Sequence, residues 1–186
     1  MKKIPTLFAR DWDGDRRYVL DEVTPGCEWV VKGEGTPTRK YDGTCVMFDG
    51  DHWWARREVK AGKPLPPEFV LINADTETSK AVGWEPIEQS SFARWHTEAL
   101  EDEDGEPFTS WSAGTYELVG PKVNGDPEGY GFHALILHAY ATKLTGVPLN
   151  FTELGAWLHA YPYEGIVWHH PDGRMCKIKK RDFPSR

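Results

Sequence analysis

The sequence predicts an α+β domain in which strands of antiparallel sheets outnumber the helices packed on them. Short alternating or apolar runs, separated by Gly, Pro and Asp, recur along the 186 residues, and this pattern is typical of strands. Only residues 150–161, "NFTELGAWLHAY", show a clear helical repeat. Because no internal repeat and no Ser/Gly linker divides the chain, we expect a single domain over residues 1–186.

Two pairs of runs predict β-hairpins. "TCVMF" and "HWWARRE" flank Asp49-Gly50, and "GIVWHH" and "RMCKIKK" flank Pro171-Asp172-Gly173. Asp-Gly steps of this kind mark tight turns between strands. The runs "GTYELVG" (114–120) and "FHALILHAY" (132–140) predict further buried strands.

The clearest helix carries its apolar residues on one face. Leu154, Trp157, Leu158 and Tyr161 follow the i, i+3, i+4, i+7 spacing of an amphipathic helix. Asn150 or Thr152 could cap its start. Residues 88–100, "EQSSFARWHTEAL", give a second and weaker helical pattern.

Composition excludes several classes of protein. Hydrophobic residues make up 39% and aromatic residues 13%, which favours a folded chain over a disordered one. No apolar run approaches the ~20 residues of a membrane span, and no apolar stretch follows the two lysines near the start, so we expect a cytoplasmic protein without a signal peptide or membrane partner. The three cysteines form no CxxC pair, which argues against a disulfide framework or a structural zinc site.

Charge is unevenly distributed along the chain. The net charge of −7 argues against non-specific coating of nucleic acid. Residues 98–106, "EALEDEDGE", are expected to form a solvated surface loop. The last ten residues carry five Lys and Arg against one Asp, so a local basic patch is compatible with the acidic total.

The segment Lys40-Tyr41-Asp42-Gly43 is either an ordinary exposed turn or a turn that carries a nucleophilic lysine, so Lys40 is expected on a turn in both cases. A lysine that attacks phosphorus must be uncharged, so its ordinary pKa of ~10.4 has to be lowered by burial or by nearby cations. The polyphosphate under attack needs cationic side chains and Mg²⁺, and Mg²⁺ needs carboxylate ligands. The rest of the chain decides between the two interpretations.

The chain supplies such groups in order. Glu117 lies in the strand "TYELVG", and Glu164 opens the strand "EGIVWHH". Lys177 and Lys179 follow in "CKIKK", where the two-residue period of a strand directs both side chains to one face. The Pro-Asp-Gly turn folds the strands of Glu164 and Lys177 side by side, so these charges can meet.

In this order, "KYDG", "ELVG", "EGIV" and "KIK" resemble motifs I, III, IV and V of the covalent nucleotidyltransferases. These comprise ATP-dependent DNA ligases, RNA ligases and mRNA capping guanylyltransferases. "ELVGPKVNGDP" and "EGIVWHHPDGRMCKIKKRDF" are most similar to RNA ligases, in particular to the small 5′–3′ RNA ligase family that includes a vertebrate member. The resemblance covers about residues 36–183 and implies a nucleotidyltransferase (adenylylation) domain that uses ATP and Mg²⁺ (or Mn²⁺).

The resemblance also implies a role for each matched residue. Lys40 would be the catalytic nucleophile that forms a lysyl-AMP intermediate. Arg56 would lie near the ribose or the incoming phosphate, with Arg57 as the alternative. The expected cofactor-binding residues are Arg56, Glu117, Lys177 and Lys179, the two lysines on the α-phosphate.

Three carboxylates are implied as metal ligands, namely Asp42, Glu117 and Glu164, with Glu117 also able to contact the ribose. The residue that stacks on adenine should lie in "GYGFHALIL", where Tyr130, Phe132 and His133 all remain candidates.

The implied function is that of an ATP-dependent RNA ligase in RNA repair, which joins 5′-phosphate and 3′-OH ends without an evident protein partner. Only seven residues follow Lys179, too few for the OB-fold domain of DNA ligases and capping enzymes, so no such domain is expected. Two alternatives remain: a minimal ATP-dependent DNA ligase, and a non-catalytic nucleotide- or RNA-binding module. Covalent labelling by ATP, and a comparison of nicked RNA with nicked DNA, would distinguish them.

Overall fold

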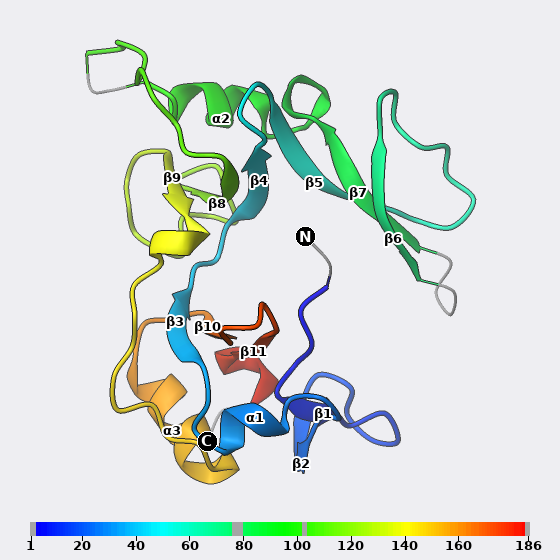
Figure 1. Ribbon diagram of the computed structural model, residues 1–186, viewed down its shortest axis with the longest axis vertical. Helices are drawn as coiled ribbons and strands as arrows, with labels where there is room; N and C mark the ends of the chain where they lie inside the picture. Colours follow the sequence, from blue (N-terminus) through cyan, green and yellow to red (C-terminus); the bar gives the residue numbers. More distant parts are fainter. Residues whose placement is uncertain (1–2, 76–79, 102–103, 185–186) are drawn as a thin grey trace. The chain divides into compact units, whose positions relative to one another are not determined.

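The computed structural model describes residues 3–75, 80–101 and 104–184 and has the predicted α+β character (Figure 1). Its sheets are antiparallel and its helices are few. The chain divides into two compact units. The discontinuous unit contains residues 3–41 and 141–184, and the continuous unit contains residues 42–140. The single domain over 1–186 stays a prediction.

The discontinuous unit holds two sheets. Strands β1 (Phe8–Arg10) and β2 (Val19–Val23) form a two-stranded sheet. Strands β3 (Thr36–Lys40), β10 (Gly165–His169) and β11 (Met175–Lys179) form a three-stranded sheet in the order β11-β10-β3. Its helices are α1 (Glu28–Val31), α3 (Phe151–Ala160) and the short 3₁₀-helix η3 (Lys180–Asp182).

Alternation along β10 and β11 divides their residues between two faces. Ile166 and Trp168 on β10, and Cys176 and Ile178 on β11, are buried in the core of this unit. Lys177 and Lys179 alternate with these apolar residues and therefore share the opposite face, as their spacing predicts. The hydrophobic face thus fixes the direction in which the two lysines point.

Helix α3 packs on the same core. Its Leu154 and Leu158 are fully buried. Asn150 is the N-cap, because its side-chain oxygen accepts a hydrogen bond of 2.9 Å from the Glu153 amide. This contact selects Asn150 over Thr152 as the cap.

Chain segments outside the three-stranded sheet cover both of its edges. At β11, the Leu7 amide donates to the Lys177 carbonyl at 2.7 Å, and the Lys177 amide donates to the Pro5 carbonyl at 2.9 Å. At β3, residues 142–144 take the equivalent place, since Arg39 N–H donates to the Thr142 carbonyl at 2.8 Å. The backbones of β3 and β11 therefore form hydrogen bonds both to β10 and to a segment outside the sheet.

The continuous unit contains a six-stranded sheet in the order β6-β7-β5-β4-β8-β9. The strands are β4 (Thr44–Phe48), β5 (Trp53–Val59), β6 (Val70–Asp75), β7 (Lys80–Pro86), β8 (Gly114–Val119) and β9 (Ala134–Leu137). Helix α2 (Ala93–Glu98) packs on the core of this unit through Trp95 and through Phe92, the residue before the helix. The 3₁₀-helices are η1 (Ile87–Gln89) and η2 (His138–Tyr140).

Most predicted elements are confirmed, and three differ. Both hairpins and the helix at 151–160 form. Within the run 132–140 only Ala134–Leu137 is a strand, and η2 follows it. The pattern at 88–100 is split by a turn between η1 and α2. Lys40 does not lie on a turn: it is the last residue of β3. Residues 102–103 of the predicted acidic loop lie outside the described residues.

In the described part of the chain, no helix combines the length and the apolar character that crossing a bilayer requires.

Candidate active site

Three residues form a row across the three-stranded sheet. Gly165 at the start of β10 pairs with Lys40 on β3 and with Lys179 on β11. Because paired residues of antiparallel strands point to the same face, the two lysines extend from the same side of the sheet. The pairing brings together two lysines that lie far apart in the sequence.

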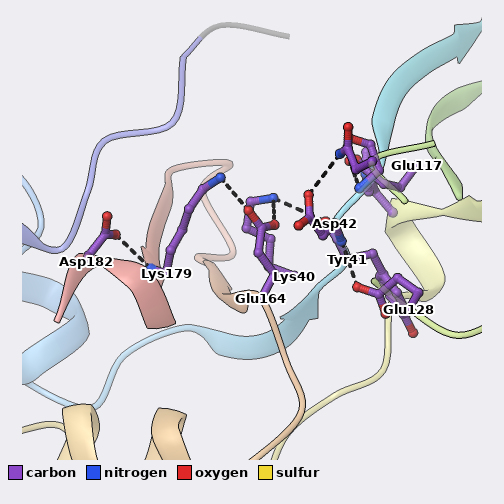
Figure 2. Close-up of polar contacts among 11 residues, drawn as sticks. Lys40, Tyr41, Asp42, Glu117, Glu128, Glu164, Lys179 and Asp182 are labelled. Carbon is purple, nitrogen blue, oxygen red and sulfur yellow. Dashed lines mark hydrogen bonds and ion pairs between the residues drawn. The ribbon is translucent and has the colours of Figure 1, made fainter. Parts of the chain in front are cut away.

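Glu164, the residue before β10, lies between these lysines (Figure 2). One carboxylate oxygen accepts a hydrogen bond from the Lys40 ammonium, and the other accepts one from the Lys179 ammonium. Burial of Glu164 would raise the pKa of its carboxyl group, but the charges of Lys40 and Lys179 outweigh burial and hold this pKa below its ordinary value. Glu164 is therefore a partly buried anion that orients two cations.

Gly165 is required where the three strands meet. A Cβ atom at this position would lie 2.1 Å from the Ile178 carbonyl oxygen and 2.9 Å from the Lys179 Cα. Any side chain would therefore push β11 away from β10.

We expect Gly165→Ala to destabilise the fold by about 1–3 kcal/mol, the usual cost of overpacking. It should also displace Lys179 from Glu164, because the clash is with the backbone of β11. Denaturant unfolding measures the first effect, and a crystal structure of the variant measures the second. An unchanged unfolding midpoint would contradict the close approach of the two strands.

Lys177 lies two residue pairs further along the sheet, opposite Val167. Burial, followed by the charges of Lys179 and Lys40, lowers the pKa of Lys177 to about 8, although Glu164 and Asp182 act in the opposite direction. The adjacent Lys180 points elsewhere, since its ammonium donates to the Tyr161 carbonyl. The strand alternation thus separates Lys177 and Lys179 from Lys180.

The lowered pKa of Lys177 predicts a pH dependence of stability. An unfolded lysine keeps its proton to ~10.4, whereas folded Lys177 loses it at about 8, so between these values the unfolded chain binds more protons. The free energy of unfolding should therefore rise with pH across this window, relative to that of Lys177→Met. Urea unfolding of both proteins at about pH 7.5 and about pH 9.5 measures this difference. A constant difference would contradict the shift.

Asp182 contacts both the end of β11 and the neighbouring strand β1. Its carboxylate accepts a hydrogen bond of 2.8 Å from the Lys179 amide and pairs at 2.8 Å with Arg10 of β1. Asp182 is only 3% exposed. Neither Asp182 nor Arg10 was a predicted site residue, and no signal in the sequence links positions so far apart.

Aromatic contacts fix the end of β3 beside Lys40. The Arg39 guanidinium lies over the rings of Tyr41 and Tyr163, at 4.8 and 4.9 Å from their centroids. The Tyr41 hydroxyl lies 3.0 Å from the Thr142 hydroxyl. The Lys40 ammonium also donates to the Tyr41 carbonyl at 3.2 Å, so the lysine is held in one direction.

In the continuous unit, a network surrounds Asp42 and Glu117. One oxygen of Glu117 accepts from the Gly43 amide at 3.1 Å, and the other lies 3.0 Å from His138 Nε2. The Asp42 carboxylate accepts from the Asn124 amide group at 3.0 Å. His138 and Asn124 are contacts that sequence reasoning missed, because their positions relative to Glu117 and Asp42 depend on how β8 and β9 pair and where the loop between them runs.

Gly43 permits this network. A Cβ atom there would lie 2.2 Å from the Leu118 carbonyl oxygen and 2.9 Å from Glu117 Cγ. The glycine that follows Asp42 is therefore explained by the close approach of β8 rather than by a tight turn.

Strand pairing distinguishes Arg56 from Arg57. Ala55 pairs with Val46, which pairs with Tyr116, and all three face the core. Arg56 is the next residue after Ala55, as Glu117 is after Tyr116, so alternation places Arg56 and Glu117 on the same face of the sheet. Arg57 instead pairs with buried Glu85 at 3.9 Å.

The predicted metal ligands lie in both units, with Glu164 in the discontinuous one and Asp42 and Glu117 in the continuous one. Among residues 3–75, 80–101 and 104–184, no three His, Cys, Asp or Glu side chains are grouped so as to hold a metal ion. The donor set consists of carboxylate oxygens, which suit hydrated Mg²⁺ with few protein ligands. The metal site stays a prediction.

The three candidates for adenine stacking lie in different surroundings. Phe132 is 63% exposed, and its ring meets that of Tyr130 edge-on at 5.7 Å. His133 stacks on Trp95 and lies 2.9 Å from a Glu98 oxygen. The stacking residue remains open among the three.

The site places the largely buried Glu164 carboxylate between Lys40 and Lys179. The model of the RNA ligase 1 family matches residues 94–184 of this chain. The match includes Glu117, Glu164, Lys177 and Lys179, whereas Lys40 lies outside it. The predicted resemblance to RNA ligases is thereby confirmed.

Individual relatives carry the same name. The chain is 28% identical to RNA ligase 1 of Rattus norvegicus in a match that covers 69% of this chain and 46% of the relative. It is 25% identical to RNA ligase 1 of Danio rerio in a match that covers 70% of this chain and 46% of that protein. The chain spans about half the length of the curated relatives it matches.

Proposed function

We propose that this protein is an ATP-dependent RNA ligase with a nucleotidyltransferase fold, which joins RNA 5′-phosphate and 3′-OH ends through a lysyl-AMP intermediate. The observation that carries the proposal is the position of Glu164 between Lys40 and Lys179. Similarity to proteins named RNA ligase 1 supports RNA as the substrate.

Lys40 is the proposed nucleophile. Its ammonium group first loses a proton to water. The uncharged nitrogen then attacks the α-phosphorus of ATP, so that a nitrogen–phosphorus bond forms as the bond to pyrophosphate breaks. Pyrophosphate leaves, and the nitrogen releases a second proton to water. Glu164 orients Lys40 and accepts its hydrogen bond, and Lys179 offers the α-phosphate a positive charge. Positioning and charge stabilisation account for most of the catalysis in such phosphoryl-type transfers.

The later steps consume the AMP held on Lys40. A 5′-phosphate oxygen of the RNA attacks the same phosphorus, and the Lys40 nitrogen leaves and regains a proton. A 3′-OH then attacks the activated 5′ end and displaces AMP, which joins the two ends. Arg56 and Glu117 are the proposed contacts for the ribose and phosphates, since they share one face of the six-stranded sheet.

Asp42, Glu117 and Glu164 are the proposed ligands of a hydrated Mg²⁺, which would neutralise charge on the phosphates of ATP. Within this set, the Asn124 amide group orients Asp42, and the Gly43 amide orients Glu117. These hydrogen bonds hold the carboxylate oxygens in place without a metal.

Incubation with α-labelled ATP and Mg²⁺, followed by denaturing electrophoresis, tests the proposal. We expect a labelled protein band whose label passes to 5′-phosphorylated RNA. Nicked RNA and nicked DNA in parallel identify the preferred polynucleotide. A folded protein that takes up no label would reject the ligase and favour a nucleotide- or RNA-binding module.

A further inference from the structure

A concave pocket beside β11 gathers basic side chains of the discontinuous unit. Its volume is ≈ 560 Å³. Six cationic residues line it, from distant parts of the sequence: Lys3, Arg10, Arg17, Lys177, Lys179 and Arg181. Such a concentration of positive charge in a chain of net charge −7 favours an anionic ligand.

The protein neutralises only part of this charge. Asp182 pairs with Arg10 at 2.8 Å, Asp15 pairs with Arg17 at 2.7 Å, and Glu164 pairs with Lys179. In the described part of the chain, no ion pair neutralises the side chains of Lys3, Lys177 or Arg181. The pocket therefore keeps a positive excess that a multiply charged anion would balance.

The pocket lies on the side of β11 away from Lys40. Strand β10 separates Lys40 from Lys179, and the segment of residues 5–7 covers the other edge of β11. Lys3, Thr6 and Arg10 line the pocket from that outer side, and Lys177 and Lys179 form its inner wall. A phosphate held between Lys40 and Lys179 would thus have Lys40 on one side and the pocket on the opposite side.

We propose that this pocket binds the phosphate group that stands opposite Lys40 on the α-phosphorus, an inference that rests on the proposed function. In an in-line displacement, the entering and leaving atoms occupy opposite sides of phosphorus. While the nitrogen–phosphorus bond forms, this group is the departing pyrophosphate of ATP. While that bond breaks, it is the attacking 5′-phosphate of the RNA, so one pocket serves both steps.

The first test measures binding of inorganic pyrophosphate by titration calorimetry, without ATP or RNA. The variant is the double substitution Lys3→Gln/Arg181→Gln, because both side chains line the pocket and neither forms an ion pair with a residue that the structure describes. The matched control is Lys32→Gln/Lys180→Gln, which removes the same charge from residues that do not line it. We expect the pocket variant to lose about tenfold in affinity for each cation removed, and the control to bind like the wild type.

The second test distinguishes the two sources of phosphate by comparing RNA oligomers that end in a 5′-phosphate or a 5′-hydroxyl. We expect the wild type to prefer the 5′-phosphate and the pocket variant to lose this preference. Equal weakening for both oligomers would indicate a backbone-binding surface and overturn the RNA half of the proposal.

The pocket and the proposed function can fail separately. Normal ATP labelling, with pyrophosphate binding equal in the pocket variant and its control, would overturn the pocket and leave the ligase. If ATP does not label the protein, and only the pocket variant loses pyrophosphate binding, the ligase proposal is rejected. The pocket would then be an anion-binding site without a role in ligation.

Discussion

Lys40→Arg should abolish covalent labelling by ATP while the protein remains folded. A guanidinium keeps the positive charge that pairs with the partly buried Glu164, but it cannot be deprotonated near neutral pH and so cannot attack phosphorus. Denaturing electrophoresis with α-labelled ATP measures the loss, and denaturant unfolding confirms the fold.

Lys40→Ala should also be inactive, but it leaves Glu164 with one ammonium partner instead of two. Removing one partner of a buried ion pair is destabilising, so this variant should unfold at lower denaturant concentration than Lys40→Arg. Labelled Lys40→Arg protein would contradict the assignment of the nucleophile.

Lys179→Met should reduce self-adenylylation about 10²–10³-fold in the absence of RNA, the usual cost of removing one group that stabilises developing charge. Lys179 is held beside the proposed position of the α-phosphate by Glu164. RNA is omitted so that a loss cannot come from weaker RNA binding. Initial rates of AMP uptake at saturating ATP give the comparison.

Lys180→Met is the matched control, because it removes the same charge one residue further along the chain. Its ammonium contacts the Tyr161 carbonyl and not Glu164, so we expect a rate close to that of the wild type. Equal and small losses in the two variants would mean that "KIKK" is a basic surface without a role in nucleotide chemistry.

Local signals predict the parts of the fold that depend on neighbouring residues. The β10–β11 hairpin follows from its Pro-Asp-Gly turn and its alternating strands, and α3 follows from its apolar repeat. The pairing of β3 with β10 has no such signal, because its hydrogen bonds join residues far apart in the chain. Strand β3 was therefore not predicted as an element, and Lys40 was expected on a turn.

The candidate site also combines features that neighbouring residues predict with features that depend on residues far apart in the chain. A two-residue period is enough to place Lys177 and Lys179 on one face. The role of Asp182 is not visible in the sequence, since it depends on a backbone amide of β11 and on Arg10 of another sheet. The sequence contains Gly165 next to Glu164, but only the register of three strands explains why no side chain fits there.

The covered edges of the three-stranded sheet have a consequence for self-association. An edge strand with unpaired N–H and C=O groups is a template on which another chain can add a strand. Here residues 5–7 occupy that position along β11 at Lys177, and residues 142–144 occupy it along β3. These two short segments block intermolecular β-pairing at both edges of the sheet. If either segment detached, it would expose an edge strand prone to aggregation close to Lys40 or Lys179.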